Sequence, residues 1–288
     1  MGSEMCIRDR YLSDSTHNTD KNTVQTKRDE LLQRAQSMVS NLNSQYGTYY
    51  VFGGNDVSTT PFALSDDGST LTFTHKFTDG TTQTMTMKLT YDKANNSYGY
   101  EISDADLNKM LTAMREQGRV DVGYGDISNE KTLLDTYTGG LNVLTGLSSD
   151  ALRAMSDQDA KDAIKKGLNE GPLGLVSSAV MASDQYINGT IDAGTFTTTM
   201  GNLQTGMSKA EHTISTVYAD LGNKSSILDT TKKRLDALED SLETQYSDLL
   251  GADPYEAIME MYSYQYSYSA ALKVGANLLQ SSLFDFLS

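Results

Sequence analysis

Apolar residues recur at intervals of seven along the last third of the chain. The positions with this period are Met200, Met207, Ile214, Leu221, Leu228, Leu235, Leu242 and Leu249. Such a period places side chains on one narrow face of a helix, as in a coiled coil or an elongated bundle. Gly201, Gly206 and Gly222 weaken the early part of this helix. The pattern therefore predicts a long helix whose apolar seam packs against a partner.

A second helix is predicted shortly after this one. Asp253 suits the N-cap, Pro254 suits the first helical position, and Glu256 completes a capping box. The apolar stripe of this helix consists of Ile258, Met261, Tyr268, Leu272, Leu279 and Phe286, and Ala257, Tyr264, Ala271 and Leu278 widen it. Tyrosines alternate from residue 262 to residue 268 and would ring a helix. We expect a terminal helix this apolar to need a partner.

The N-terminal half begins with one predicted helix and continues with a hairpin. Residues 19–46 lack Gly and Pro, and their apolar residues share one helical face. Residues 71–77 and 85–91 alternate apolar and polar side chains around the turn Asp79-Gly80, which is typical of a β-hairpin. We expect a third strand over 98–102, and then a helix over 104–117 that Ser103 caps.

The rest of the middle region carries weaker patterns. They favour a β-prone run at 49–55, an extended piece at 120–124, helices over 129–138 and 149–168, and a break at 171–174. Together the elements predict an α+β fold. In this fold, N- and C-terminal segments form an elongated, long α-helical bundle or coiled coil, and a β-rich central region is inserted between them.

We predict five segments along the chain. Residues 11–47 and 181–250 form the two parts of a helical rod domain, residues 48–180 form a central β-containing outer domain, and residues 251–288 form a C-terminal axial helix. Residues 1–10 have no helical or strand period and resemble translated sequencing-adapter read-through, so we interpret them as a non-native leader. The alternative is an ordinary disordered terminus.

Composition narrows the possible functions. The chain has 288 residues and a net charge of −15, which disfavours general binding to nucleic acid or to an anionic membrane surface. Cys6 is the single cysteine, so a disulfide or a cysteine-based zinc site within the chain is excluded. No apolar run reaches the length of a membrane span, and the start lacks the pattern of a cleaved signal peptide.

The sequence gives no support for catalysis. His17, His75 and His212 lie outside the zinc-protease spacing, and no nucleophile elbow or phosphate-binding glycine loop occurs. Asp66-Asp67-Gly68 lacks the other ligands of a calcium loop. The carboxylates between the leucines of the long helix are interpreted as a solvated face. We therefore expect no enzyme activity and no catalytic, cofactor or metal site.

The C-terminal residues resemble a known family. Residues 253–257, 272–276 and 283–287 are similar to the C-terminal axial helix of bacterial flagellins and their hook-associated relatives, and residues 219–222 with 235–242 are similar to the preceding helix. This resemblance implies an assembly interface made of Ile258, Met261, Tyr268, Leu272, Leu279, Leu283 and Phe286. It also implies a rod seam made of Ile214, Leu221, Leu228, Leu235, Leu242 and Leu249.

One segment distinguishes branches of this family. Residues 46–55, closed by residues 60–62, resemble the motif of the FlgL-type hook–filament junction proteins. The residues that carry this motif are Tyr50, Phe52, Gly53, Gly54, Pro61 and Phe62. Family members begin with a further axial helix that carries the export signal. The first helix predicted in this chain corresponds to the last N-terminal helix of family members, so we interpret the chain as an N-terminally truncated fragment.

The resemblance implies a structural protein of the bacterial flagellum that joins hook and filament. Its partners would be further copies in a ring, the hook-side adaptor FlgK, flagellin and an export chaperone. It would lie outside the cell after type III export without a cleaved signal peptide. Flagellin itself is the alternative. An enzyme grafted on such a scaffold, or a free-standing coiled-coil protein from another pathway, are the other classes considered.

Overall fold

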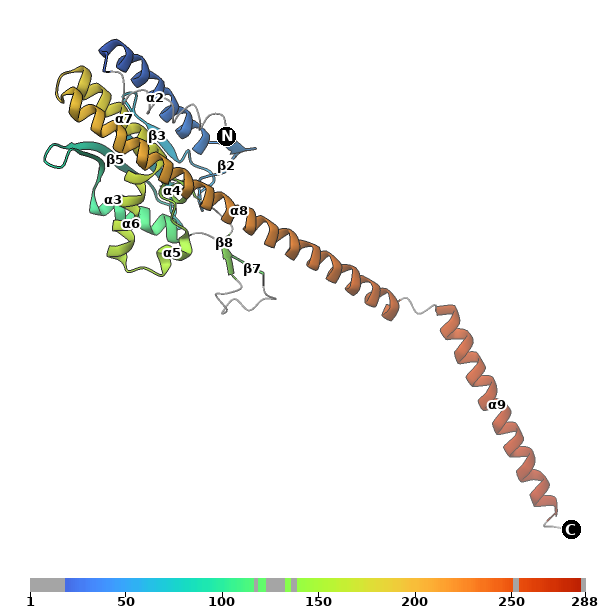
Figure 1. The fold of residues 1–288 in the computed structure, drawn as a ribbon. Helices are drawn as coiled ribbons and strands as arrows, with labels where there is room; N and C mark the ends of the chain where they lie inside the picture. The colour runs from blue at the N-terminus through green and yellow to red at the C-terminus, as the bar shows by residue number, and fades with distance from the viewer. Residues whose placement is uncertain (1–18, 117–118, 123–132, 136–138, 251–253, 286–288) are drawn as a thin grey trace. The chain divides into compact units, whose positions relative to one another are not determined.

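The computed structural model describes residues 19–116, 119–122, 133–135, 139–250 and 254–285, and side chains at 119–120, 135, 249–250 and 278–285 lie outside the description. The chain divides into two compact units, Met1–Ser226 and Ile227–Ser288. Helices and an antiparallel sheet follow one another in the first unit, and the described part of the second is helical (Figure 1). The predicted α+β class is confirmed.

A four-stranded antiparallel sheet lies at the centre of the first unit. Strands β3 (Phe62–Leu64), β4 (Thr70–Lys76), β5 (Thr82–Asp92) and β6 (Ser97–Ile102) pair in sequence order, so the sheet is a meander. One face is buried and consists of Phe62, Leu71, Phe73, His75, Met85, Met87, Leu89, Tyr100 and Ile102. The period-two alternation therefore predicts both the hairpin and the third strand correctly.

Helix α2 (Lys21–Leu42) packs along helix α7 (Pro172–Ile187) in the same unit (Figure 1). The side chain of Asp20 caps α2 by accepting a hydrogen bond from the amide of Thr23. A bidentate ion pair joins the two helices, with Arg28 Nε 2.8 Å from Asp184 Oδ1 and Arg28 Nη2 3.0 Å from Asp184 Oδ2. Helix α2 ends earlier than predicted because Tyr46 belongs to a strand.

Helix α7 replaces the break predicted at residues 171–174. Gly171 is its N-cap and Pro172 occupies the first turn. These two residues, which usually interrupt a helix, therefore begin one at this position. The helix is buried on most sides and has no amphipathic period. Two of its buried serines donate their hydroxyls to backbone carbonyls one turn earlier: Ser178 Oγ to Gly174 at 2.7 Å and Ser183 Oγ to Ala179 at 2.8 Å.

Four shorter helices complete the described part of the first unit: α3 (Asp104–Arg115), α4 (Gly140–Thr145), α5 (Ser149–Arg153) and α6 (Asp157–Glu170). Helix α3 packs on β5 and α6 packs on β6, while α5 packs on α3. The helix predicted over 104–117 is confirmed, including the Ser103 cap. The single helix predicted over 149–168 is wrong, because Ser156 caps a new helix by accepting from the amide of Asp159.

The helix predicted over 129–138 is also wrong where the chain is described. Strand β8 (Leu133–Asp135) pairs antiparallel with β7 (Arg119–Asp121), and Val120 lies opposite Leu134. The pairing of the two strands provides the backbone hydrogen bonds that a helix would otherwise provide. Local helix propensity is a weak preference that such tertiary pairing outweighs. The extended piece predicted over 120–124 is confirmed at residues 120–121, residue 122 follows the strand, and residues 123–124 lie outside the described residues.

Two long helices form the C-terminal third, α8 (Ala193–Leu250) and α9 (Pro254–Asp285). Helix α8 is continuous through Gly201, Gly206 and Gly222, as the seven-residue period predicts. In the first unit, α8 contributes Phe196, Met200, Met207 and Ala210 to the core. The ring of Phe196 stacks on Tyr186 with centroids 4.7 Å apart. The predicted domain boundaries remain predictions.

Candidate assembly surfaces

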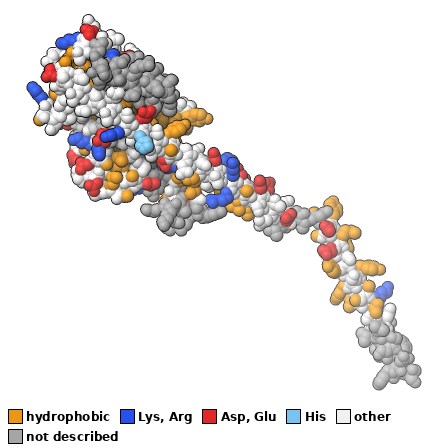
Figure 2. Space-filling view, viewed as in Figure 1, with side chains coloured by type: hydrophobic (Ala, Val, Ile, Leu, Met, Phe, Trp, Pro, Cys, Tyr) orange, Lys and Arg blue, Asp and Glu red, His pale blue; other side chains and the backbone are white. Residues whose placement is uncertain are grey.

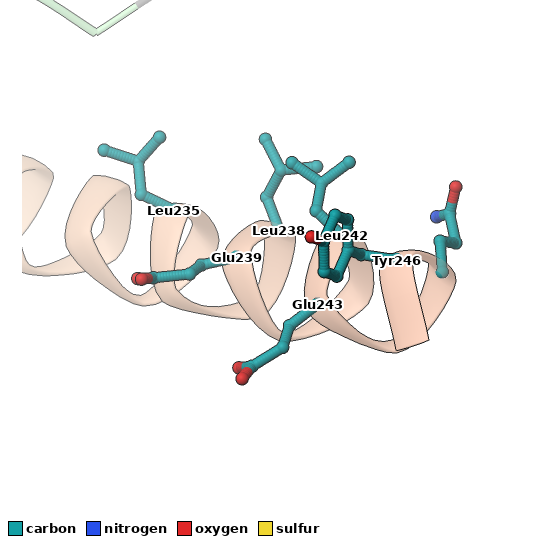
Figure 3. A pocket seen from close by; sticks show the side chains of 7 residues that line it. Leu235, Leu238, Glu239, Leu242, Glu243 and Tyr246 are labelled. Atoms are coloured by element: carbon teal, nitrogen blue, oxygen red, sulfur yellow. The ribbon is translucent and has the colours of Figure 1, made fainter. Parts of the chain in front are cut away.

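A leucine stripe lies on α8 within the second unit. We define it as Leu235, Leu238, Leu242 and Tyr246, whose exposed fractions are 54%, 46%, 55% and 66%. The three leucines point to one side of the helix, and Glu239 and Glu243 project away from them on an adjoining side (Figure 3). Seven-residue spacing produces this alignment, since two turns of helix return a side chain close to the same face. The stripe is an open apolar surface with a carboxylate flank.

Helix α9 exposes apolar side chains around most of its circumference. Ile258 is 46% exposed, Met261 56%, Tyr268 67% and Leu272 57%. Hydrophobic side chains follow the helix in Figure 2. At about 100° per residue, tyrosines 255, 262, 264, 266 and 268 spread over several faces. One flat partner therefore covers only part of this surface.

A polar strip interrupts the apolar surface of α9 on one side. It consists of Glu256, Glu260, Ser263 and Ser267, which fall on one face at helical spacing. The Ser267 hydroxyl donates to the carbonyl of Ser263 at 2.8 Å, which is a bond within the helix. The strip has the composition of a face that stays in contact with water.

The seven-residue period changes its environment along α8. Met200 and Met207 are buried in the first unit, and Ile214 is half-buried. Leu221 is 43% exposed and Leu228 36% exposed. The side chains of Leu249, Leu279 and Leu283, and the whole of Phe286, lie outside the described residues. One uninterrupted pattern therefore supplies a core at its start and an open surface at its end.

The motif around Phe52 has a packing role in the first unit. The Phe52 carbonyl accepts a hydrogen bond of 2.8 Å from the amide of Gly140. A side chain at Gly53 would meet the carbonyl oxygen of Asp56 at 2.0 Å, and one at Gly140 would meet the Phe62 ring at 2.3 Å. The glycines are required because backbone and ring approach so closely there.

The other motif residues belong to the same packed region. Gly54 and Pro61 are buried, Tyr50 and Phe52 are half-buried, and Phe62 lies 5.1 Å from Phe73 between ring centroids. Most of the motif residues thus pack in the first unit, and Tyr50 lies between the exposed residues Tyr49 and Val51. Sequence reasoning identified them by resemblance and gave no physical reason for their spacing.

Two polar residues that sequence reasoning missed hold this region. Asn43 bonds both backbone groups of Phe62, donating to its carbonyl at 2.7 Å and accepting from its amide at 3.0 Å. Asn43 therefore pairs with edge strand β3 as a neighbouring strand would. Both contacts join residues distant in sequence, so local patterns carry no signal for them.

Asp56 is the second of these residues. Burial alone would raise the pKa of its carboxyl group. The side chains of Ser58 and Thr59 and the backbone amides of Ser58 and Lys76 donate hydrogen bonds that outweigh burial and lower the pKa to about 2. The Lys76 amide lies 2.8 Å from Asp56 Oδ2, so the carboxylate ties the loop to the end of β4.

His75 is packed between aromatic rings in the same region. Its ring is 5.7 Å from Phe73 and 5.0 Å from Phe77 between centroids. Burial lowers the pKa of His75, and the negative charge of Asp56 partly offsets this. His75 is therefore a packed, neutral imidazole on the buried face of β4.

Neither a membrane span nor a metal centre is found in the part of the chain that the structure describes. No helix there is long and apolar enough to cross a membrane. No group of three or more His, Cys, Asp or Glu residues is placed to hold a metal ion among those residues. Asp67 instead accepts hydrogen bonds from Ser69 within its own turn.

Comparison with known proteins points to one family. Residues 204–287 match the family model of the bacterial flagellin C-terminal helical region. Searches of the curated proteins and of the solved structures find no match. The matched residues include the leucine stripe and α9. The flagellin family is structural and non-enzymatic, and its members assemble into the flagellum outside the cell.

Proposed function

We propose that this chain, whose residues 204–287 match the model of the bacterial flagellin C-terminal helical region, is the hook-associated protein FlgL, which joins hook and filament. Its task is mechanical, since subunits would stack in a ring between the hook-side adaptor and the first flagellin subunits. Flagellin, the filament subunit, is the second candidate.

The exposed apolar surface of α9 is the observation that carries the proposal. Burial of apolar surface contributes about 25 cal/mol per Å². Tyr255, Met259 and Tyr266 each leave 70% or more of their surface in water in the single chain. Contiguous apolar surface of this kind marks an interaction site. A subunit whose C-terminal helix is covered by its neighbours in a polymer accounts for this surface.

The motif of residues 50–62 favours the junction protein over flagellin. Flagellins have a different continuation at this point, whereas this chain has Phe52-Gly53-Gly54 and closes with Pro61-Phe62. In the first unit these residues fix a loop against α4 through the bond from the Gly140 amide to the Phe52 carbonyl. A different continuation would alter the surface that this loop presents.

The partners follow from this position in the flagellum. The chain would contact further copies of itself, FlgK on the hook side and flagellin on the filament side, with an export chaperone before assembly. It would leave the cell through the flagellar type III apparatus. The leucine stripe and α9 are the surfaces that these contacts would bury.

Seeded assembly on purified hooks distinguishes the two candidates. The full chain is added to hooks that carry FlgK, and the product is imaged by electron microscopy before and after flagellin is added. We expect a short, self-limited cap from which flagellin then grows filaments. Long filaments formed by this chain alone would favour flagellin. Absence of any bound material on hooks would contradict both candidates.

A further inference from the structure

Methionines have opposite surroundings in the two units of the chain. In the first unit, six of them are at most 2% exposed: Met85, Met87, Met110, Met114, Met200 and Met207. Three more are partly buried against the same core: Met38, Met155 and Met181. In the second unit, Met259 is 70% exposed and Met261 is 56% exposed. Among the residues that the structure describes, the exposed thioether groups therefore lie together on α9.

Both exposed methionines belong to the apolar surface of α9. At about 100° per residue, positions 259 and 261 lie on different sides of the helix. Met261 shares a face with Ile258 and Leu272, which belong to the apolar stripe. Met259 shares another face with tyrosines 255, 262 and 266, which are 79%, 59% and 79% exposed. A partner that covers either face would therefore enclose a methionine sulfur.

The two groups of methionines differ in how easily a small dissolved molecule reaches them. In the described part of the second unit, no side chain is buried, so the sulfur atoms of Met259 and Met261 are open to water. The core of the first unit encloses Met85 and Met87, which are both 0% exposed. A peroxide must reach the sulfur atom before it can react. Exposure therefore determines which methionines of this chain oxidise first.

The reaction of a methionine sulfur with a peroxide is an oxygen transfer. A lone pair of the sulfur attacks one oxygen of hydrogen peroxide, an S–O bond forms, and the O–O bond breaks. The other oxygen leaves as water after proton transfer, so the sulfur is oxidised and the peroxide is reduced. The product, methionine sulfoxide, is polar where the thioether was apolar. The reaction needs no catalytic group beside Met259 or Met261.

We propose that Met259 and Met261 form a modification site for peroxides, and that their sulfoxides weaken assembly through α9. This inference rests on the proposed function, because it assumes that copies of the chain bury α9 when they assemble. It adds a chemical condition to that function, since the surface is competent for assembly while both sulfur atoms are reduced. Methionine sulfoxide reductases, which return the sulfoxide to the thioether, reverse the change.

The sulfoxide opposes burial of α9 in two ways. The side chain loses apolar character, and its new oxygen is a hydrogen-bond acceptor that loses water when the surface is covered. A thioether, in contrast, adapts to irregular surfaces and contacts aromatic rings favourably. The fold of the monomer should not change, because both side chains are largely in water there. Oxidation should therefore affect assembly and leave folding intact.

Treatment of the full chain with hydrogen peroxide, followed by peptide mass spectrometry, tests the site. All chains carry Cys6→Ser, so that oxidation of a thiol does not contribute. In the diluted monomer we expect Met259 and Met261 to oxidise at least about tenfold faster than Met85 and Met87. In the assembled state their oxidation should become much slower. After catalase removes the peroxide from the monomer, sedimentation should show self-association weakened about tenfold or more.

Leucine substitutions provide matched controls. Met259→Leu with Met261→Leu replaces each thioether by an apolar side chain of similar volume, so this variant should assemble like the parent and continue to do so after peroxide treatment. Met38→Leu with Met181→Leu, in the first unit, keeps both sulfur atoms of α9 and should lose assembly as the parent does. Methionine sulfoxide reductases A and B with a thiol reductant should restore assembly of the oxidised parent.

Three results would overturn the inference and leave the proposed function standing. They are equal oxidation rates on α9 and in the core, full assembly of a parent in which both sulfoxides have formed, and equal loss of assembly in the parent and in the variant with Met259→Leu and Met261→Leu. Oxidation of α9 that is as fast in the assembled state would show that assembly leaves α9 open, and would contradict both. An untreated chain that does not self-associate would also contradict both.

Discussion

The two units of the chain use the same kind of helix in opposite ways. In the first unit, α2 buries Val24, Leu31 and Ala35 almost completely against its neighbours. In the second unit, no side chain that the structure describes is buried, although α9 is rich in Tyr, Met and Leu. Helical stability in proteins comes mainly from packing of an apolar face. The apolar side chains of the second unit are therefore left exposed for a partner to cover.

The largest expected effect concerns assembly through α9. We expect Met261→Asp with Leu272→Asp to reduce polymer yield at least about a hundredfold. Each buried apolar side chain contributes about 1.5–3 kcal/mol, and an unpaired buried carboxylate costs more. Sedimentation measures the loss. Ser263→Asp with Ser267→Asp, on the polar strip, is the matched control and should assemble nearly normally. An equal loss of polymer yield from both pairs of substitutions would mean that the two faces of α9 contribute equally to assembly.

Removal of one leucine should distinguish the two units in stability. Leu31→Ala deletes a side chain that is 1% exposed. We expect it to lower the free energy of unfolding of the first unit by about 2–5 kcal/mol. Leu242→Ala deletes one that is 55% exposed and should change that free energy by less than about 0.5 kcal/mol. Urea unfolding of the monomer measures both, and similar losses would contradict the comparison.

Acid should act on the first unit through Asp56. Its pKa of about 2 lies below the unfolded value of 3.8, so its contribution to stability is present above pH 4 and is lost as the pH falls toward 2. After solvent screening, this shift contributes less than about 2 kcal/mol to stability. Asp56→Asn should remove this pH dependence. Urea unfolding between pH 5 and pH 2 tests it, and an unchanged slope in the variant would assign the dependence to other groups.

The smallest effect compares one substitution at two glycines. Nothing lies within 4 Å of a side chain built at Gly275 in α9, whereas one at Gly140 would meet the Phe62 ring at 2.3 Å. Gly275→Ala should stabilise its helix by about 0.5–1 kcal/mol and slow amide exchange nearby. Gly140→Ala should destabilise the first unit by about 1–3 kcal/mol. A change in stability of the same sign at both positions would contradict this account.

Periodic elements could be predicted from sequence, because their burial pattern is local. The alternation around Asp79-Gly80 and the period of seven through α8 both correspond to observed elements. Helix α7 was missed because a helix buried on most sides has no period. The local pattern does not predict the strand at residues 133–135, because its pairing partner, Arg119–Asp121, is distant in sequence.

The candidate surfaces were predictable only in part. The apolar excess of α9 indicated a missing partner from sequence alone. The helix predicted over residues 19–46 includes Tyr46, which instead lies in a short strand, because Tyr50 bonds to Val57 and Thr60 and Val51 bonds to Ser44. The role of Asp56 depends on the amide of Lys76, which is distant in sequence. Sequence patterns show which side chains are apolar, and tertiary contacts determine which of them are buried.

Amide hydrogen exchange of the diluted monomer tests the central claim most directly. The account predicts that amides from Tyr262 to Ala276 in α9 exchange nearly as fast as those of a marginal isolated helix, because no neighbour packs on them. Amides of α7 should be strongly protected in the same sample. On assembly, α9 should become protected while α7 changes little. Strong protection of α9 in the monomer would contradict the claim that other chains complete this helix.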